Sequence, residues 1–333
     1  MEAPVSRVWL RTPRFDLALQ VGALAGILPA IVIYVAYDAA RASSLLPLAS
    51  LVAVPFLHVF GSFFFAFSPE RNRSASPPRR LAAIWVGWAV CVVALQAAVP
   101  RVLATFALIY GGWHILRQNF GFLRELAHRD GLAGPRALRR LDLAACLAPA
   151  VALWLFVAAR GPWRFIGADV YHLAVPPAVL ALAFVLVPVT AFARERWLAG
   201  RGRSSAAGRL LLAGNAVALL APALFLDDLT LIYTLSASYH GMQYLAYLAE
   251  RERDRLPGAH PTRVLLPLAS AIVTSMLGWY LALTLVAWAV PRGADFAIVI
   301  AWYAIVPFHY FVDGRIWRRA RGGDPVRVPG PGS

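Results

Sequence analysis

Long apolar runs separated by short arginine-rich loops dominate the chain. Runs of about 18 to 25 apolar residues have the length of a bilayer-spanning helix. The pattern predicts about ten of them, at 16–37, 45–67, 81–99, 102–126, 141–159, 174–193, 209–226, 229–249, 264–290 and 295–314. Because no linker is long enough to separate two domains, the sequence predicts an all-α, polytopic membrane bundle. The transmembrane domain would cover residues 1–317, and residues 318–333 would form a disordered basic C-terminal tail.

Composition favours the same class of protein. Hydrophobic residues make up 60% of the chain and charged residues only 15%, and the mean hydropathy is +0.62. A soluble domain of 333 residues has too little interior for that much apolar surface, whereas a bilayer can solvate it. The two cysteines, Cys91 and Cys146, both lie in apolar runs and form neither a metal-binding pair nor a disulfide framework.

The distribution of arginine predicts the orientation in the membrane. The net charge is +15 and all 32 basic residues are arginine. The N-terminus, the loops 68–80, 127–140, 194–208 and 250–263, the tail and their flanks carry 26 of them. The opposite loops carry Arg41, Arg101, Arg160, Arg164 and Arg292. Short cytoplasmic loops are enriched in basic residues, so we expect both termini to be cytoplasmic, in a bacterial inner membrane. Topology explains the positive charge, and no nucleic-acid partner is expected.

Four histidines are embedded in predicted spans. His128, His172 and His260 lie in loops, but His58, His114, His240 and His309 lie within apolar runs. These four runs all cross the membrane in the same direction, and each histidine precedes the cytoplasmic boundary by nine or ten residues. At a rise of 1.5 Å per residue they form a layer about 15 Å from that boundary. Intramembrane ionisable residues are usually functional, and a shared depth predicts a shared site.

Polar residues follow three of these histidines by about one helical turn, on the same helix face. The pairs are His114 with Gln118, His240 with Gln243 and His309 with Asp313, whereas His58 has only Ser62. We therefore predict His58, His114, His240, His309 and Asp313 as metal ligands, with Gln118, Asn119 and Gln243 orienting them. Arg117, within a span, is the candidate for holding a polar end of the substrate.

Other interpretations of these residues stay open. A single histidine in a membrane helix can simply hydrogen-bond to a neighbouring helix, and the amides can do the same. Asp313 can instead pair with Arg315 or Arg318, and Arg117 can extend toward the cytoplasm. The loop 160–173 holds Trp163, Phe165 and Tyr171, which we interpret as aromatic residues at the membrane interface.

The type of ligand indicates the chemistry. Imidazole suits iron, copper, zinc and nickel, and histidines with a carboxylate are typical of non-haem iron or copper. Zinc-dependent hydrolysis would need a nearby general base, and the sequence has no HExxH arrangement. We therefore predict a metal-dependent oxidoreductase of oxygenase or desaturase type, with iron as the metal. Its substrate would be a lipid, an isoprenoid or another lipophilic small molecule entering from the bilayer, and its electron donor is not indicated.

Two alternatives use the same histidines differently. They can ligate haem as bis-histidine pairs, although no predicted span contains two of them. They can also serve as the proton relay or substrate site of a proton-coupled transporter. Pro55 and Pro307, which precede His58 and His309, would kink two helices near such a site.

The segments WHILRQN, HGMQY and HYFVDGRIWR resemble the histidine motifs of membrane-embedded oxygenases and desaturases. Those enzymes pair histidines in HxxxH and HxxHH boxes, whereas here Gln118, Gln243 or Asp313 stands near the place of the second histidine. In architecture the chain is more similar to the Brp/Blh-type β-carotene dioxygenases, polytopic bacterial membrane proteins with isolated intramembrane histidines that hold iron. The resemblance implies iron-dependent oxygen chemistry on an isoprenoid and assigns no role to a single residue.

Overall fold

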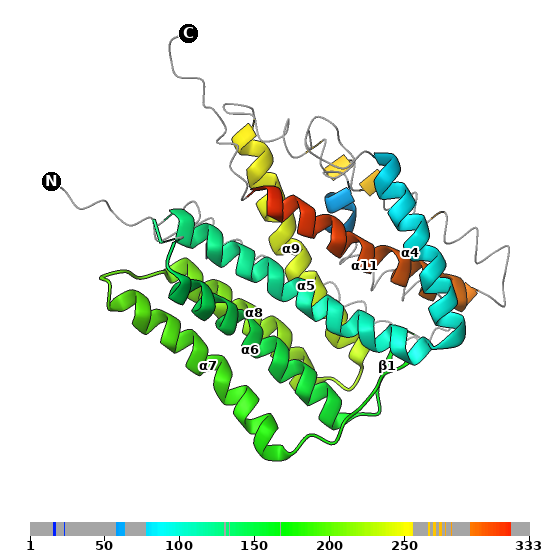
Figure 1. The fold of residues 1–333 in the computed structure, drawn as a ribbon, viewed down its shortest axis with the longest axis horizontal. Coiled ribbons are helices and arrows are strands. Elements are labelled where there is room, and N and C mark those ends of the chain that lie inside the picture. Colours follow the sequence, from blue (N-terminus) through cyan, green and yellow to red (C-terminus); the bar gives the residue numbers. More distant parts are fainter. Residues whose placement is uncertain are drawn as a thin grey trace, which may run out of the picture.

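The computed structural model describes the central part of the chain almost continuously. The described residues are 16–17, 23, 58–63, 78–129, 131–132, 134–166, 168–255, 266, 269–270, 273–274, 277, 281 and 294–320. They form α4 (Pro78–Ala98), α5 (Pro100–Arg129), α6 (Arg136–Arg160), β1 (Arg164–Phe165), β2 (Ala168–Asp169), α7 (Pro177–Ala199), α8 (Ala206–Phe225), α9 (Leu229–Arg255) and α11 (Ala294–Ala320). The described part is therefore almost entirely helical, as predicted (Figure 1).

The predicted count of about ten spans is not reached in this described part. Four helices in it are long and apolar enough to cross a membrane: Arg79–Ala98, Arg136–Arg160, Pro177–Ala199 and Ala206–Phe225. Helices α5 and α9 coincide with predicted spans but are less apolar, because each carries a histidine, a glutamine and several small or aromatic polar residues. The predicted spans 16–37, 45–67 and 264–290 lie largely outside the described residues.

Helix α5 is the centre of the arrangement. It packs against α4, α6, α8, α9 and α11, while α7 packs mainly on α6 at the far edge (Figure 1). The outward faces of α4 and α7 are apolar, with Val86, Val90, Leu182 and Val185 exposed. Apolar faces of this extent are typical of helices that contact lipid.

Two prolines inside helices are compensated by neighbouring helices. A proline has no N–H to donate, so the carbonyl four residues earlier loses its intrahelical partner. For Pro307 in α11 that carbonyl belongs to Tyr303, and Trp88 Nε1 of α4 donates to it at 3.0 Å. For Pro222 in α8 it belongs to Ala218, which accepts from Ser236 Oγ of α9 at 2.9 Å. Side chains thereby satisfy backbone groups that lipid could not.

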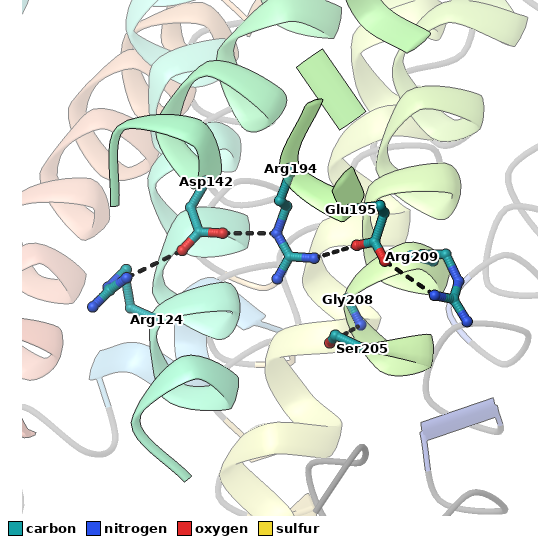
Figure 2. A network of polar contacts seen from close by, with 7 residues as sticks. All are labelled: Arg124, Asp142, Arg194, Glu195, Ser205, Gly208 and Arg209. Carbon is teal, nitrogen blue, oxygen red and sulfur yellow. Dashed lines mark hydrogen bonds and ion pairs between the residues drawn. The ribbon is translucent and has the colours of Figure 1, made fainter. Parts of the chain in front are cut away.

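A buried network of charged side chains connects the four helices α5, α6, α7 and α8 at one end. Arg194 lies between Asp142 and Glu195, with Arg124 and Arg209 at the two ends of the chain of contacts (Figure 2). Arg194 Nε lies 2.7 Å from Asp142 Oδ1, and Arg124 Nη1 lies 3.2 Å from Asp142 Oδ2. Because Asp142 and Arg194 are almost fully buried, each needs the other as a partner.

Candidate metal centre

The four histidines of the apolar runs converge on one point, as predicted. His114 comes from α5, His240 from α9 and His309 from α11, and His58 belongs to the helical residues 58–63. Their ring centroids form a closed four-sided arrangement with sides of 4.9 Å (His58–His240), 4.7 Å (His240–His114), 4.8 Å (His114–His309) and 4.8 Å (His309–His58). One nitrogen from each ring lies within 4.8 Å of the other three.

The imidazole nitrogens are buried and short of partners. All four side chains are at most 7% exposed. Within the described residues, neither ring nitrogen of His240 has a hydrogen-bond partner, and Nε2 of His114 and Nε2 of His309 also have none. A buried polar atom without a partner is costly, so several of them facing one another indicate a ligand.

His309 is fixed in an orientation that suits a metal ligand. Its Nδ1 lies 2.7 Å from the carbonyl oxygen of Val306, which can only accept a hydrogen bond. Nδ1 therefore carries the proton, and Nε2 presents its lone pair to the other histidines. A backbone carbonyl holding the far nitrogen is the usual support of a metal-bound histidine.

Asp313 lies beside the cluster, one turn after His309. Its Oδ2 is 3.5 Å from His114 Nε2 and 3.9 Å from His309 Nε2. Its Oδ1 accepts a hydrogen bond from the Tyr244 hydroxyl at 2.9 Å. The carboxylate is thus positioned as an added ligand or as an acceptor for an imidazole N–H.

The three predicted supporting amides act on the scaffold. Gln118 Nε2 donates to the backbone oxygen of His240 at 3.1 Å and so links α5 to α9 beside the cluster. Asn119 Nδ2 donates to Asn215 Oδ1 of α8 at 2.8 Å, and Gln243 Nε2 donates to the Tyr239 hydroxyl at 2.8 Å. None of these bonds joins an imidazole nitrogen.

Arg117 lies on the exposed side of α5. Its guanidinium carbon is 5.9 Å from the Trp113 ring and 5.8 Å from the Phe120 ring. The structure therefore places Arg117 against aromatic rings at the bundle surface, apart from the buried histidines.

Glycines allow the close approach around the cluster. A Cβ on Gly241 of α9 would lie 2.7 Å from His58 Nδ1, far inside van der Waals contact. A Cβ on Gly111 of α5 would overlap the Tyr233 hydroxyl. At both positions the space that a larger residue would need is occupied by a side chain of another helix.

A small cavity of about 20 Å³ adjoins the four histidines. Its other walls are mainly apolar and aromatic, including Ile166, Tyr233, Trp302, Val306 and Tyr310, and they also contain Thr234. That volume is about what one or two water-sized groups require. Ile166 reaches the cavity from the loop between β1 and β2, with a φ of 45° that is rare for a β-branched residue.

The predicted interfacial position of loop 160–173 is wrong for two of its three aromatic residues. Tyr171 is exposed, but Trp163 and Phe165 are buried at 7% and 0% exposure. Strands β1 and β2 pair antiparallel as a small hairpin, and the Phe165 ring contacts Tyr233 of α9 and Trp302 of α11. The hairpin thereby closes the side of the cavity that lies toward the N-terminal ends of α9 and α11.

The aromatic wall of the cavity was not among the predicted site residues. Tyr233 lies seven residues before His240, and Trp302 lies seven residues before His309, so each shares a helix face with its histidine. This seven-residue spacing is the feature of the sequence from which both aromatic residues could have been predicted. The hairpin carries no comparable signal, because a two-residue strand has no detectable periodicity.

Comparison with known proteins returned no matching family model, no matching curated protein and no matching solved structure. The buried histidine cluster and the helical scaffold are therefore the observations on which function is argued.

Proposed function

We propose that His58, His114, His240 and His309 bind one transition-metal ion in the interior of a membrane protein. The convergence of four buried imidazoles carries this proposal, and among the described residues His114, His240 and His309 each keep a ring nitrogen without a hydrogen-bond partner. Metal–imidazole bonds are about 2.0–2.1 Å, so ligands on opposite sides of an ion lie about 4.2 Å apart. The observed spread of up to 4.8 Å needs only a small inward movement of the rings.

A single ion fits the site better than haem does. The four ring centroids are less than 5 Å from their neighbours, and the adjoining cavity is about 20 Å³. A porphyrin would have to be inserted between rings that already contact one another edge to face. Among single ions, an all-imidazole set with one carboxylate nearby favours iron or copper.

The proposed activity is that of a membrane-embedded oxidoreductase of oxygenase or desaturase type, with iron as the metal. The apolar walls of the cavity and the apolar outer faces of α4 and α7 support a lipid or isoprenoid substrate that arrives from the bilayer. The proposal includes about ten spans, cytoplasmic termini and a bacterial inner membrane, supported by the distribution of arginine. The likeness to Brp/Blh-type dioxygenases is part of the same proposal.

Metal analysis of purified full-length protein tests the centre. We expect about one iron or copper ion per chain in the wild type. We expect a large loss in His114→Ala and in His240→Ala. The matched control is His128→Ala, because His128 lies on the same helix as His114 but is exposed.

Mass spectrometry of lipids from an expressing host tests the reaction. Products with added oxygen or added double bonds should appear with the wild type and His128→Ala, and disappear with His114→Ala. A metal-free wild type would contradict the metal centre. A metal-loaded protein that leaves host lipids unchanged would contradict only the oxygenase or desaturase activity on those lipids.

A further inference from the structure

Two tyrosines outside the predicted site line the cavity beside the histidine cluster. The Tyr310 ring stacks on the His114 imidazole, with centroids 4.1 Å apart and planes 19° apart. It also contacts the His309 ring at 4.5 Å. The Tyr310 hydroxyl is hydrogen-bonded to the Tyr233 hydroxyl, and both residues line the cavity.

The tyrosine pair has one O–H group that is not used in the hydrogen bond between the two residues. Two hydroxyl groups carry two protons, and the bond between them uses one. Neither hydroxyl has another hydrogen-bond partner among the described residues. The second O–H is therefore left over at the wall of the cavity, in surroundings where an unpaired polar group is costly.

The contacts of the two tyrosines with the histidines indicate which of them has the unused O–H group. Tyr310 is the one in contact with His114 and His309, whereas Tyr233 lies two turns before His240 on α9. We propose that Tyr233 donates to Tyr310, and that Tyr310 donates its own O–H to a small ligand with an acceptor atom held in the cavity at the metal. The inference rests on the proposed metal centre and extends it by a ligand-binding residue.

The surroundings define the class of ligand. The cavity has room for about one or two water-sized groups, and its remaining walls offer apolar and aromatic surface. Asp313 approaches His114 and His309 at Nε2, so its carboxyl group lies beside the imidazoles. The phenol is the hydroxyl donor left at the cavity wall, because the Thr234 hydroxyl, which also lines the cavity, donates to the Thr230 carbonyl oxygen at 2.7 Å. A water-sized ligand with an oxygen acceptor, such as water, hydroxide or dioxygen, fits this combination.

Glycine makes the arrangement possible. A side chain at Gly111 would occupy the space of the Tyr233 hydroxyl, so the small residue on α5 allows Tyr233 to reach Tyr310. The tyrosine pair therefore depends on α5, α9 and α11, which also supply three of the histidines.

Fluoride binding to the Cu(II)-loaded full-length protein tests the inference. Fluoride is about as small as water, accepts hydrogen bonds strongly, and its binding can be followed by the EPR spectrum of the copper. We expect Tyr310→Phe to weaken fluoride binding about tenfold or more, the effect of losing one hydrogen bond to an anion. Tyr233→Phe should weaken it less, by about twofold to threefold, because the direct donor remains.

Tyr303→Phe is the matched control. Tyr303 is a buried tyrosine of the same helix whose hydroxyl donates to the Phe165 carbonyl at 3.2 Å, and fluoride affinity should not change when it is lost. Unchanged affinity in a copper-loaded Tyr310→Phe variant would overturn the inference and leave the metal centre standing. Equal weakening in Tyr303→Phe would also overturn it, since the effect would then be structural. A wild type that binds no copper, iron or other metal would overturn both proposals.

Discussion

At the scale of single residues, unpaired polar atoms are the strongest evidence for a ligand. Native proteins pair nearly all buried polar groups, and each exception costs about 1–3 kcal/mol. Here several exceptions face one another: both nitrogens of His240, Nε2 of His114 and of His309, and Oδ2 of Asp313. A cation at their centre would bind one nitrogen of each ring together with the carboxylate oxygen, whereas separate interhelical hydrogen bonds would leave each histidine facing a different helix.

Gly241 tests how tightly this cluster is built. Gly241→Ala places a methyl group 2.7 Å from His58 Nδ1, so the ring must move away from its three neighbours. We expect metal affinity to fall about tenfold or more, measured by competition with a chelator of known affinity. Gly87→Ala is the control, because nothing lies within 4 Å of a Cβ at Gly87. Equal affinities in both variants would mean that His58 is not a ligand.

The sequence could predict which residues meet at this scale, but not what surrounds them. Each of the four histidines lies nine or ten residues before the predicted cytoplasmic end of its helix, and the four helices were predicted to run in the same direction. The convergence of the histidines could therefore be predicted from the sequence. The hydrogen-bond partner of each side chain depends on how its helix is rotated about its own axis, and a single sequence does not reveal that rotation. Asn119 therefore pairs with Asn215, and Arg117 lies outward beside Trp113.

At the scale of elements, the hairpin Arg164–Asp169 is the main addition to the predicted structure. It is held by backbone groups as well as rings: Tyr303 donates to the Phe165 carbonyl, and Thr230 accepts from the Ile166 N–H at 3.3 Å. Its aromatic residues look like interfacial residues in sequence, because burial and interface favour the same side chains. Only the packing of α9 and α11 around it determines that Phe165 lies inside.

Phe165→Ala tests whether the hairpin supports the bundle. The ring is fully buried against Tyr233 and Trp302, so its removal leaves a cavity beneath the hairpin. We expect a loss of about 3 kcal/mol in the free energy of unfolding, measured in detergent with a denaturant. Tyr171→Ala in the same loop should change it by less than about 1 kcal/mol, because Tyr171 is 49% exposed. Equal stability of the two variants would show that the hairpin is dispensable for packing.

At the scale of the whole molecule, the charge network joins α5, which carries His114, to α6, α7 and α8. Asp142→Asn removes the charge that faces Arg124 and Arg194 while keeping the shape (Figure 2). Because the buried Arg194 would keep only Glu195 as a carboxylate partner among the described residues, we expect a loss of about 1.5–3 kcal/mol in stability. Arg209→Gln should cost less than about 1 kcal/mol, since Arg209 is 52% exposed. Thermal unfolding in detergent compares the two, and similar melting temperatures would contradict a stabilising role for the buried pair.

Some of the helices could be located from hydropathy alone, and others could not. The positions of α6, α7 and α8 follow from hydropathy to within six residues at each end, because each is apolar over a length that could cross a membrane. Helices α5 and α9 were also expected, yet their composition alone does not mark them as spans, since their polar residues face the interior. A strict hydropathy criterion therefore misses α5 and α9, which carry His114 and His240, although the apolar runs at 102–126 and 229–249 locate them.

Orientation in the membrane is the remaining prediction at this scale. Tyr171 and Ser204 lie just before and just after α7, whose 23 residues span about 35 Å, enough to cross the apolar core. The Ser204 end is rich in arginine, including Arg196, Arg201 and Arg203, so it should face the cytoplasm. With Cys91 and Cys146 replaced by alanine, a membrane-impermeant maleimide should label Tyr171→Cys in intact spheroplasts. It should label Ser204→Cys only after the membrane is permeabilised. The reverse pattern would place the termini outside, and labelling of both cysteines in intact spheroplasts would show that α7 does not span the membrane.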